Sequence, residues 1–546
     1  HPSVFPARYT VFILCIVLAL VALVLTFALS GYFVWPFLVF AVLSAIGYLD
    51  VRQTRHAILR NYPVSGHFRF LFEAIRPELR QYFFESNQDG RPFSRERRSM
   101  VYDRAKDIED VLPFGTELDV YDTSYGWVNH SICPKPHNHE DMRVTIGGPD
   151  CKQPYSASLY NISAMSFGSL SGNAILALNK GAKAGGFYHD TGEGSVSRYH
   201  RQGGGDLVWE LGSGYFGCRA DDGTFDAEKF AKQAVEPQIK MIEIKMSQGA
   251  KPGHGGVLPG PKVTEEIAEA RGVPIGTDCI SPASHSAFST PVELLHFIVQ
   301  LLELSGGKPV GFKLCIGHRW EFMAIVKAML KTGIKPDFIV VDGAEGGTGA
   351  APVEFANRLG TPLRQGLTFV HNCLVGTGLR EDIRIGAAGK LISAFDIAGA
   401  LALGADWVNS ARGFMFAVGC IQSQSCHTNR CPTGVATQDP KRQQALVVPD
   451  KAQRVANFHR NTLKSLRDFS AAAGLSHPRE FKPEHFYLHE GLREIMPASV
   501  ALSWLKKGAL LEKSHNIPGY STYWEMAEAE SFHPAKSVEA AKSAHA

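Results

Sequence analysis

Two long apolar runs at the N-terminus constrain this chain more than any other feature of its sequence. The first run, TVFILCIVLALVALVLTFALS, covers residues 10–30, and the second, YFVWPFLVFAVLSAIGYL, covers residues 32–49. Neither run contains a charged side chain, and each is close to the roughly 20 residues that cross a bilayer as a helix. The sequence therefore predicts a transmembrane helical hairpin over residues 1–50.

The basic residues around the two runs predict the orientation of this hairpin. Arg8 precedes the first run, Arg52, Arg55 and Arg60 follow the second, and the turn between the runs has neither Lys nor Arg. By the positive-inside rule, both ends of the hairpin lie in the cytoplasm. We therefore expect the lipid bilayer as a partner, and a protein anchored in a bacterial-type inner membrane whose catalytic domain faces the cytoplasm. A cleaved signal peptide and a buried soluble hairpin are the alternatives, although the first run is long for a signal peptide.

Length and charge limit what the rest of the chain can be. The 546 residues exceed what one core usually uses, so we expect one large domain with additions. With 56 basic and 53 acidic side chains, the net charge is +3, which gives no support to nucleic acid as a partner. Residues 51–155 are mixed and rich in charge, and we interpret them as a neck and lead-in segment.

From about residue 156 to residue 440, short apolar runs alternate with helical stretches such as Pro291–Leu304 and Glu321–Lys331. This alternation predicts an α/β fold, a (β/α)8 TIM barrel with parallel strands. The expected strands are Leu159–Ser163, Gly186–His189, Met241–Lys245, Val273–Thr277, Val310–Leu314, Phe338–Val341, Ile383–Gly386 and Trp407–Asn409. Residues 441–546 are expected to form a C-terminal helical extension and a tail. Such a barrel carries its chemistry on the loops that follow the strands.

A group of three cysteines is the strongest local signal for chemistry. Cys420, Cys426 and Cys431 have the spacing C-x5-C-x4-C and are followed by Pro432, whereas the other seven cysteines are scattered and are expected to be buried thiols. Thiolates are soft ligands suited to iron–sulfur clusters or zinc. Three ligands rather than four argue against a closed structural zinc site. Incidental cysteines in a loop remain the alternative.

Glycine-rich segments near the last expected strands suggest a phosphate site. The last two loops of such a barrel often bind a phosphate through backbone N–H groups, and simple turn glycines are the alternative. The candidate residues are Gly386, Gly389, Ser410, Ala411 and Arg412, with a further flexible loop at Gly346, Gly347, Thr348 and Gly349.

Longer motifs make the resemblance to a family specific. The cysteine segment continues into TGVATQ, and the chain also contains ISAMSFGSLS at 162–171, IKMSQGAKPGHGG at 244–256 and GGTGAAP at 346–352. Together these segments resemble the FMN domain of glutamate synthases over roughly residues 158–440. The resemblance implies FMN and an iron–sulfur cluster, of the three-iron, four-sulfur type, at 420–431 as cofactors.

The resemblance also implies roles for individual residues. Ala164, Met165 and Ser166 are expected against the flavin ring, Gln248 and Lys313 are expected to hydrogen-bond it, and Cys420, Cys426 and Cys431 are expected to ligate the cluster. On the substrate side it implies Glu193, Lys251 and Arg271, because cations suit a dicarboxylate such as 2-oxoglutarate.

The substrate side departs from the family pattern. Val257 stands where the family has a glutamine, and ISPASHSA at 280–287 replaces ISPPPHHD, so that His285 alone is kept of two histidines. His285 is a candidate catalyst, with a structural histidine as the alternative. The cofactor machinery is thus expected to be intact and the substrate pocket altered.

Complete glutamate synthases carry an amidotransferase domain with a nucleophilic cysteine, which is not expected here. A dinucleotide-binding fold is not expected either, since GSGYFG at 212–217 is interpreted as a turn. Electrons are therefore expected from a separate donor or acceptor, which can be a ferredoxin-like protein, a reductase or a quinone. Whether the chain forms a homo-oligomer is left open.

The hypothesis for function is reductive amination of a 2-oxo acid, or reduction of a related imine, with a small-molecule 2-oxo acid or amino acid as partner. The alternatives are an FMN-dependent dehydrogenase that passes electrons to quinone and a non-enzymatic electron-transfer subunit.

Overall fold

The computed structural model describes residues 7–136, 141–491, 494–513 and 516–544, so the ends of the predicted hairpin and tail segments lie partly outside the described residues. The chain divides into two compact units, His1–Arg95 and Glu96–Ala546. The predicted neck is thus divided between the two units.

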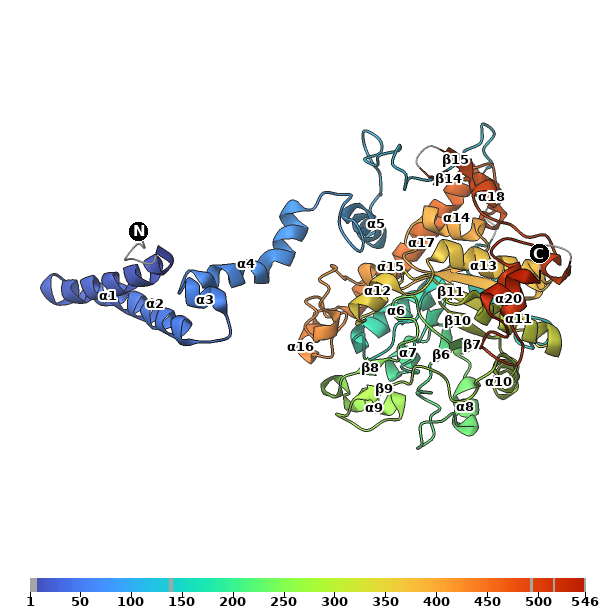
Figure 1. Ribbon diagram of the computed structural model, residues 1–546, viewed down its shortest axis with the longest axis horizontal. Helices are drawn as coiled ribbons and strands as arrows, with labels where there is room; N and C mark the ends of the chain where they lie inside the picture. The colour runs from blue at the N-terminus through green and yellow to red at the C-terminus, as the bar shows by residue number, and fades with distance from the viewer. Residues whose placement is uncertain (1–6, 137–140, 492–493, 514–515, 545–546) are drawn as a thin grey trace. The chain divides into compact units, whose positions relative to one another are not determined.

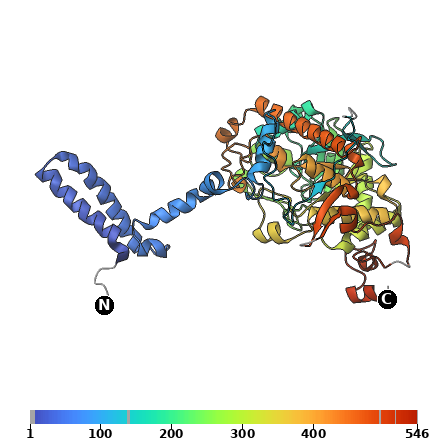
Figure 2. The same ribbon diagram turned by 90° about the horizontal axis from the view of Figure 1, so that it is seen from above.

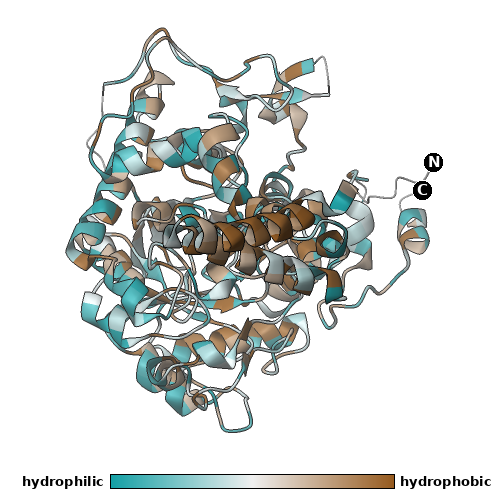
Figure 3. Ribbon diagram, turned by 90° about the vertical axis from the view of Figure 1, so that its left-hand side faces the viewer, coloured by the Kyte–Doolittle hydropathy of each residue, from teal (hydrophilic) through white to brown (hydrophobic). Residues whose placement is uncertain are grey.

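The first unit is helical throughout its ordered elements. Its elements are η1 (Ala7–Tyr9), α1 (Thr10–Ala28), η2 (Gly31–Phe33), α2 (Val34–Arg52), α3 (Ala57–Asn61), α4 (Gly66–Leu79) and the π-helical turn η3 (Arg80–Phe84). Helices α1 and α2 pack side by side (Figure 2), and both are strongly apolar (Figure 3). Among the described residues, two helical segments are long and apolar enough to cross a membrane, Ala7–Ala28 and Gly31–Arg52. The prediction of two apolar helices is therefore confirmed.

The second unit is built around a closed barrel of eight parallel strands (Figure 1). In barrel order these are β4 (Tyr160–Ile162), β5 (His189–Asp190), β6 (Leu207–Leu211), β7 (Ile239–Lys245), β10 (Val310–Leu314), β11 (Phe338–Asp342), β12 (Arg384–Ala388) and β13 (Trp407–Ser410). Strand β13 pairs in parallel with β4 and so closes the ring. The predicted (β/α)8 fold is confirmed.

One helix follows each strand and covers the outside of the ring. These helices are α6 (Gly172–Gly185), α7 (Arg198–Gly203), α8 (Ala227–Ala234), α10 (Pro291–Leu304), α11 (Arg319–Thr332), α13 (Leu363–Gly376), α14 (Ala394–Ala402) and α17 (Val448–Ala472). Helix α17 packs against α6 and α14, so a helix from the predicted C-terminal extension completes the outer layer.

Shorter elements decorate the barrel. The helices are α5 (Arg95–Ala105), α9 (Glu265–Arg271), α12 (Val353–Arg358), α15 (Arg412–Ala417), α16 (Pro440–Gln444), α18 (Ala498–Ala501), α19 (Ser521–Met526) and α20 (Val538–Ser543). The strands are β1 (Trp127–Val128), β14 (Phe486–Glu490) and β15 (Glu494–Pro497) in one sheet, β2 (Arg143–Ile146) with β3 (Tyr155–Ser158), and β8 (Val257–Leu258) with β9 (Cys279–Ile280). Single 3-10 turns are η4 (Gly260–Lys262), η5 (Arg380–Asp382), η6 (Cys426–Thr428), η7 (Pro478–Glu480), η8 (Pro483–His485) and η9 (Ala509–Leu511).

One predicted barrel strand is wrong. Val273–Thr277 is an irregular segment after α9, with Ile275 exposed and Gly276 at a positive φ. The third barrel strand is instead β6, all of whose residues are buried. A parallel barrel buries both faces of its strands, and the charged Glu210 interrupts the apolar run by which β6 could have been recognised.

Candidate active site at the mouth of the barrel

The loops that follow β4 and β5 are in direct contact. A Cβ on Gly192 would lie 2.6 Å from the backbone nitrogen of Ser166, and Gly192 has a φ of 67° that favours glycine. The close approach places Ala164, Met165 and Ser166 at the carboxyl end of the barrel, with Met165 buried and the other two half-buried. The segment predicted to face a flavin ring therefore lies at the mouth.

Gln248, on the loop after β7, is the residue that best fits a bound cofactor. Its side-chain nitrogen Nε2 is buried and has no hydrogen-bond partner within the protein. A buried donor without a partner costs roughly 1–3 kcal/mol, and a cofactor that accepts its hydrogen bond removes that cost. The neighbouring Gly249 donates its N–H to Asp342 at 2.9 Å, which ties this loop to the end of β11.

The glycine loop after β11 connects the predicted phosphate site to the cysteine loop. A Cβ on Gly347 would lie 2.8 Å from Cζ of Arg412, and a Cβ on Gly349 would have Cβ of Cys426 as its nearest neighbour at 3.8 Å. Arg412 also donates to the carbonyl of Glu345 at 2.9 Å. Two features predicted separately, the phosphate loops and the cysteines, are therefore neighbours.

The structure places the remaining phosphate candidates at or next to strand ends. Gly386 lies within β12, not after it, and its missing side chain leaves room for the indole of Trp407. Gly389 follows β12 with a φ of 133°, Ser410 is the last residue of β13, and Ala411 is the N-cap of α15. Thr348 is exposed. The expectation that Gly386 belongs to a loop is thus corrected.

Lys313 is buried in a carboxylate cluster below the mouth. Its Nζ lies 2.5 Å from Oε2 of Glu210 and 3.9 Å from Oε1 of Glu243. Asp190, Glu210 and Glu243 bring one carboxylate oxygen each within 4.8 Å of one another, and all three side chains are buried. The ammonium of Lys313 supplies positive charge beside this acidic group, because buried carboxylates need a cation or a proton.

Burial favours the protonated form of two of the three carboxyl groups. Burial, followed by the charge of Glu210, raises the pKa of Asp190 to about 7. Burial and the charge of Asp190 also raise the pKa of Glu243 well above its ordinary value. The same carboxylates outweigh the effect of burial on Lys313 and raise its pKa, so the lysine stays charged.

Glu193 and two lysines form a charged group at the mouth. Nζ of Lys245 lies 3.1 Å from Oε2 of Glu193. Burial raises the pKa of Glu193, but Lys245, Arg271 and Lys251 together lower it below its ordinary value. Burial, and then the charge of Lys245, lowers the pKa of Lys251. The mouth therefore presents an ionised carboxylate beside two amino groups.

Arg271 is part of this group and is partly bonded to the protein itself, while its Nε is buried without a hydrogen-bond partner. Its side chain is buried, Nη2 donates to the carbonyl of Phe167 at 3.0 Å, and the guanidinium lies over the ring of Phe216 at 5.2 Å. The arginine thus fixes the loop after β4, which carries the residues predicted to face the flavin.

His285 has both ring nitrogens occupied. Its Nε2 lies 2.6 Å from the carbonyl of Lys245, to which it donates, and its Nδ1 lies 2.8 Å from the hydroxyl of Tyr215. Burial lowers the pKa of His285. This arrangement fits a group that positions the end of β7, while a catalytic role for His285 stays a prediction.

Val257 pairs with Ile280 in the β8–β9 ribbon and is 52% exposed.

The cysteine loop has features of a cluster site. Gln422, Gln424 and Asn429 all have positive φ values, so the loop between the cysteines has an unusual conformation for residues with side chains. Burial raises the pKa of Cys431, but backbone N–H groups such as that of Ala436 and the Thr433 hydroxyl outweigh it and lower the pKa. Donors around a sulfur stabilise a thiolate and tune a cluster.

The three cysteine sulfurs are not gathered as closely as the ligands of one zinc ion. A tetrahedral zinc holds each sulfur at about 2.3 Å, which brings its ligands within about 4 Å of each other. In the described part of the chain, the acidic group around Lys313 is the one set of three potential ligands within 4.8 Å of one another. The cysteines are therefore spaced more widely than a single zinc requires.

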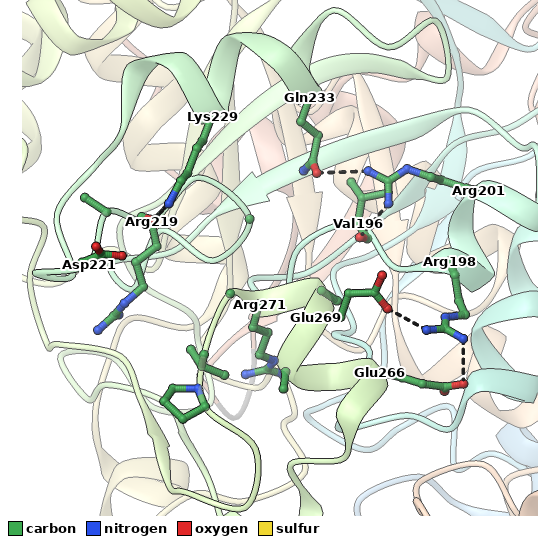
Figure 4. A pocket seen from close by; sticks show the side chains of 17 residues that line it. Val196, Arg198, Arg201, Arg219, Asp221, Lys229, Gln233, Glu266, Glu269 and Arg271 are labelled. Carbon is green, nitrogen blue, oxygen red and sulfur yellow. Dashed lines mark hydrogen bonds and ion pairs between the residues drawn. The ribbon is translucent and has the colours of Figure 1, made fainter.

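A separate cavity lies outside the ring of strands. Its volume is about 830 Å³, and it opens between α7, α8 and α9. Arg198 bridges Glu266 and Glu269 there, Arg201 reaches Gln233, and Arg271 contributes to the wall (Figure 4). Since most of its basic groups are paired with protein groups, we assign the chemistry to the mouth and not to this cavity.

Sequence reasoning missed Lys245 and the acidic group Asp190, Glu210 and Glu243. Glu210 is the one charged residue of the otherwise apolar strand β6, and a single charge in a strand that is buried on both faces is costly unless it is paired, so that signal could have identified it. Strand β7 carries Lys240, Glu243 and Lys245, and β5 consists of His189 and Asp190, so no comparable signal marks the other three residues.

Comparison with known proteins places this site in a family. The family described as "Conserved region in glutamate synthase" matches residues 140–476. The "Glutamate synthase large subunit-like protein YerD" of Bacillus subtilis (strain 168) is 40% identical over 511 residues, which cover 86% of this chain and 95% of that protein. An "Archaeal-type glutamate synthase [NADPH]" of Thermotoga neapolitana is 36% identical over 315 residues, 58% of this chain and 59% of that protein.

Solved structures give a more distant likeness. A mutant flavocytochrome b2 with benzoylformate is 12% identical, covers 83% of this chain and 91% of its own, and has a TM-score of 0.42. That score is too low to add to the argument from the barrel itself.

Proposed function

Because the chain belongs to the glutamate synthase family, we propose that it is a membrane-anchored oxidoreductase that uses FMN and an iron–sulfur cluster to form an amino group. The reaction is reductive amination of a 2-oxo acid or reduction of a related imine. The observation that carries this proposal is the position of the ionised Glu193 beside Lys245 and Lys251 at the same mouth as the unpartnered amide of Gln248.

The residues at the mouth fit FMN in chemistry and position. The side-chain amide of Gln248 has a hydrogen bond to give, Arg412 and the glycine loop suit a phosphate, and Met165 lines the mouth. The cysteines Cys420, Cys426 and Cys431 would hold the cluster beside the glycine loop. When bound, FMN supplies a hydride and the cluster supplies one-electron transfer.

The charged group suits the acid end of the substrate. Lys245 and Lys251 would bind its carboxylate, and Glu193 holds Lys245 in place. Condensation of the oxo acid with ammonia releases water and gives an imine, and two electrons with two protons convert the imine to the amine. Since burial lowers the pKa of Lys251, Lys251 is well suited to release one of these protons.

The first test is a visible spectrum of the detergent-purified protein followed by titration with 2-oxoglutarate. We expect flavin bands and a broad cluster shoulder that change on titration, and loss of the change in Lys251→Met. The exposed Lys232→Met on α8 is the matched control. Absence of both chromophores after gentle anaerobic preparation contradicts the cofactor assignment.

Turnover tests the reaction itself. With an artificial reductant and ammonia, the purified protein is expected to convert at least one 2-oxo acid to its amino acid. No product across several 2-oxo acids contradicts amination.

The apolar helices α1 and α2 favour a second candidate. A dehydrogenase that oxidises a small substrate and reduces quinone would also benefit from an anchor in the membrane. Substrate-dependent quinone reduction in membranes would select this function, whereas failure of any small acid to change the flavin spectrum would favour an electron-transfer subunit.

A further inference from the structure

Helix α4 carries an apolar stripe that no other described element of the first unit covers. Phe68, Leu71, Phe72 and Ile75 are spaced i, i+3, i+4 and i+7, so they share one face of the helix. Their exposed fractions are 60%, 53%, 58% and 38%. A helix normally buries such a stripe, because exposed apolar area in water is unfavourable.

The turn that follows continues this exposed apolar surface. In η3, Tyr82, Phe83 and Phe84 are exposed. Aromatic residues are enriched where a membrane meets water, since their rings are apolar and their edges tolerate polar surroundings.

The other faces of α4 are charged. Arg69, Glu73, Arg76 and Glu78 lie on α4, and Arg80 follows it. Glu73 pairs with Arg69 at 2.8 Å, and Arg80 lies 3.6 Å from Glu85. A helix with a charged polar side that includes arginines and an apolar face with Phe and Leu is typical of peripheral membrane binding. At 14 residues, α4 is too short to cross a bilayer.

Contacts within the first unit fix where α4 begins. The buried carboxylate of Asp50, near the end of α2, accepts a hydrogen bond from the backbone of Val64 at 2.9 Å and lies 2.8 Å from Nε2 of His67. The first turn of α4 is thereby held at the end of the second apolar helix. If α2 spans a membrane, α4 starts at its surface.

We propose that residues 66–84 form an interfacial membrane helix: Phe68, Leu71, Phe72 and Ile75 enter the boundary between headgroups and acyl chains, and Arg69, Arg76 and Arg80 contact lipid phosphates. The proposal rests on the membrane anchoring in the proposed function. It commits to a phospholipid surface because the start of α4 is bonded to Asp50, near the end of the apolar hairpin, and because three arginines lie along the helix and its end. On this proposal, residues 66–84 run along the membrane surface after the chain leaves α2.

The test places one new tryptophan on each side of α4 in the full-length protein. Phe72→Trp lies in the stripe, and Ala74→Trp, on the opposite side of the helix, is the matched control. Each variant is reconstituted in vesicles of phosphatidylcholine and phosphatidylglycerol, with and without lipids brominated on their acyl chains. Quenching is compared with that of the parent protein.

Trp35 of the parent reports the hairpin separately, because it lies near the start of α2. The emission of each new tryptophan is the fluorescence that its variant adds to that of the parent protein. We expect the brominated lipid to quench this added emission in Phe72→Trp and to leave it unchanged in Ala74→Trp. If parent emission is quenched but the added emission of Phe72→Trp is not, the interfacial proposal is overturned while the anchor stands, and the barrel or a second copy covers the stripe.

If Phe72→Trp alone is quenched, the interfacial helix stands and the spanning hairpin does not. If neither the parent protein nor Phe72→Trp is quenched, both the spanning hairpin and the interfacial helix are contradicted.

Discussion

Replacing Lys313 by methionine tests whether its ammonium holds the buried carboxylates of the barrel together. Lys313→Met keeps a long side chain but leaves Asp190, Glu210 and Glu243 without the cation that lies 2.5 Å from Glu210. Removing one partner of a buried ion pair costs about 3–5 kcal/mol, because the remaining charge is buried without compensation. We therefore expect the free energy of unfolding to fall by about that amount.

The pH dependence of this loss has a definite sign. Burial raises the pKa of Asp190 to about 7, so the folded protein keeps a proton that the unfolded chain releases near pH 4. Stability from this proton is fully present below the unfolded pKa and is lost as pH rises through the folded pKa. Without Lys313 the carboxylates are harder to ionise, so the loss in Lys313→Met is expected to be larger at pH 8 than at pH 5.

Urea unfolding in detergent measures the effect through the fluorescence of Trp209 and Trp407, which are fully buried in the barrel. Measurements with and without added FMN separate the charge effect from loss of cofactor. The double variant Lys313→Met with Glu210→Gln removes one charge of each sign and is expected to recover part of the loss. A loss below about 1 kcal/mol in the single variant, or a double variant that is less stable than the single one, refutes the reasoning.

Three further variants test the site. Cys431→Ser is expected to remove the broad cluster absorbance and leave the flavin bands, whereas the exposed Cys133→Ser keeps both; an unchanged spectrum contradicts the ligand assignment. Gln248→Leu is expected to weaken FMN binding about five- to tenfold, the equivalent of one hydrogen bond, as measured by fluorescence titration of the apoprotein; equal affinity would show that its amide is not used. Val257→Gln is expected to tighten 2-oxoglutarate binding in the spectral titration, and since Val257 is 52% exposed the fold should tolerate the change; an unchanged dissociation constant would mean that an amide here does not contact the acid.

The sequence predicted the fold well where apolar runs were uninterrupted. Val310–Leu314 and Pro291–Leu304 have the predicted bounds, because a fully buried strand and a capped amphipathic helix both leave clear patterns. The predictions failed where pattern and environment disagree. Val273–Thr277 is apolar but irregular, and β6 is buried although it contains Glu210.

Sequence motifs identified residues of the candidate site but not which of them contact one another. Motifs named Glu193 and Lys251, yet the direct partner of Glu193 is Lys245. Lys245 is the last residue of β7, whereas Glu193 lies beyond the end of β5. Only closure of the barrel brings such distant positions together, and no local pattern in the sequence records which strand ends become neighbours.

The cations at the mouth divide into two kinds when their partners are considered. Arg271 is buried, bonded to the carbonyl of Phe167 and stacked over Phe216, so its charge is used to fix a loop. Glu193 is the ionised carboxylate that Lys245, Lys251 and Arg271 share, and Glu210 also acts on Lys245. The two lysines are half-buried whereas Arg271 is buried, so a substrate acid can reach the lysines more easily than the arginine.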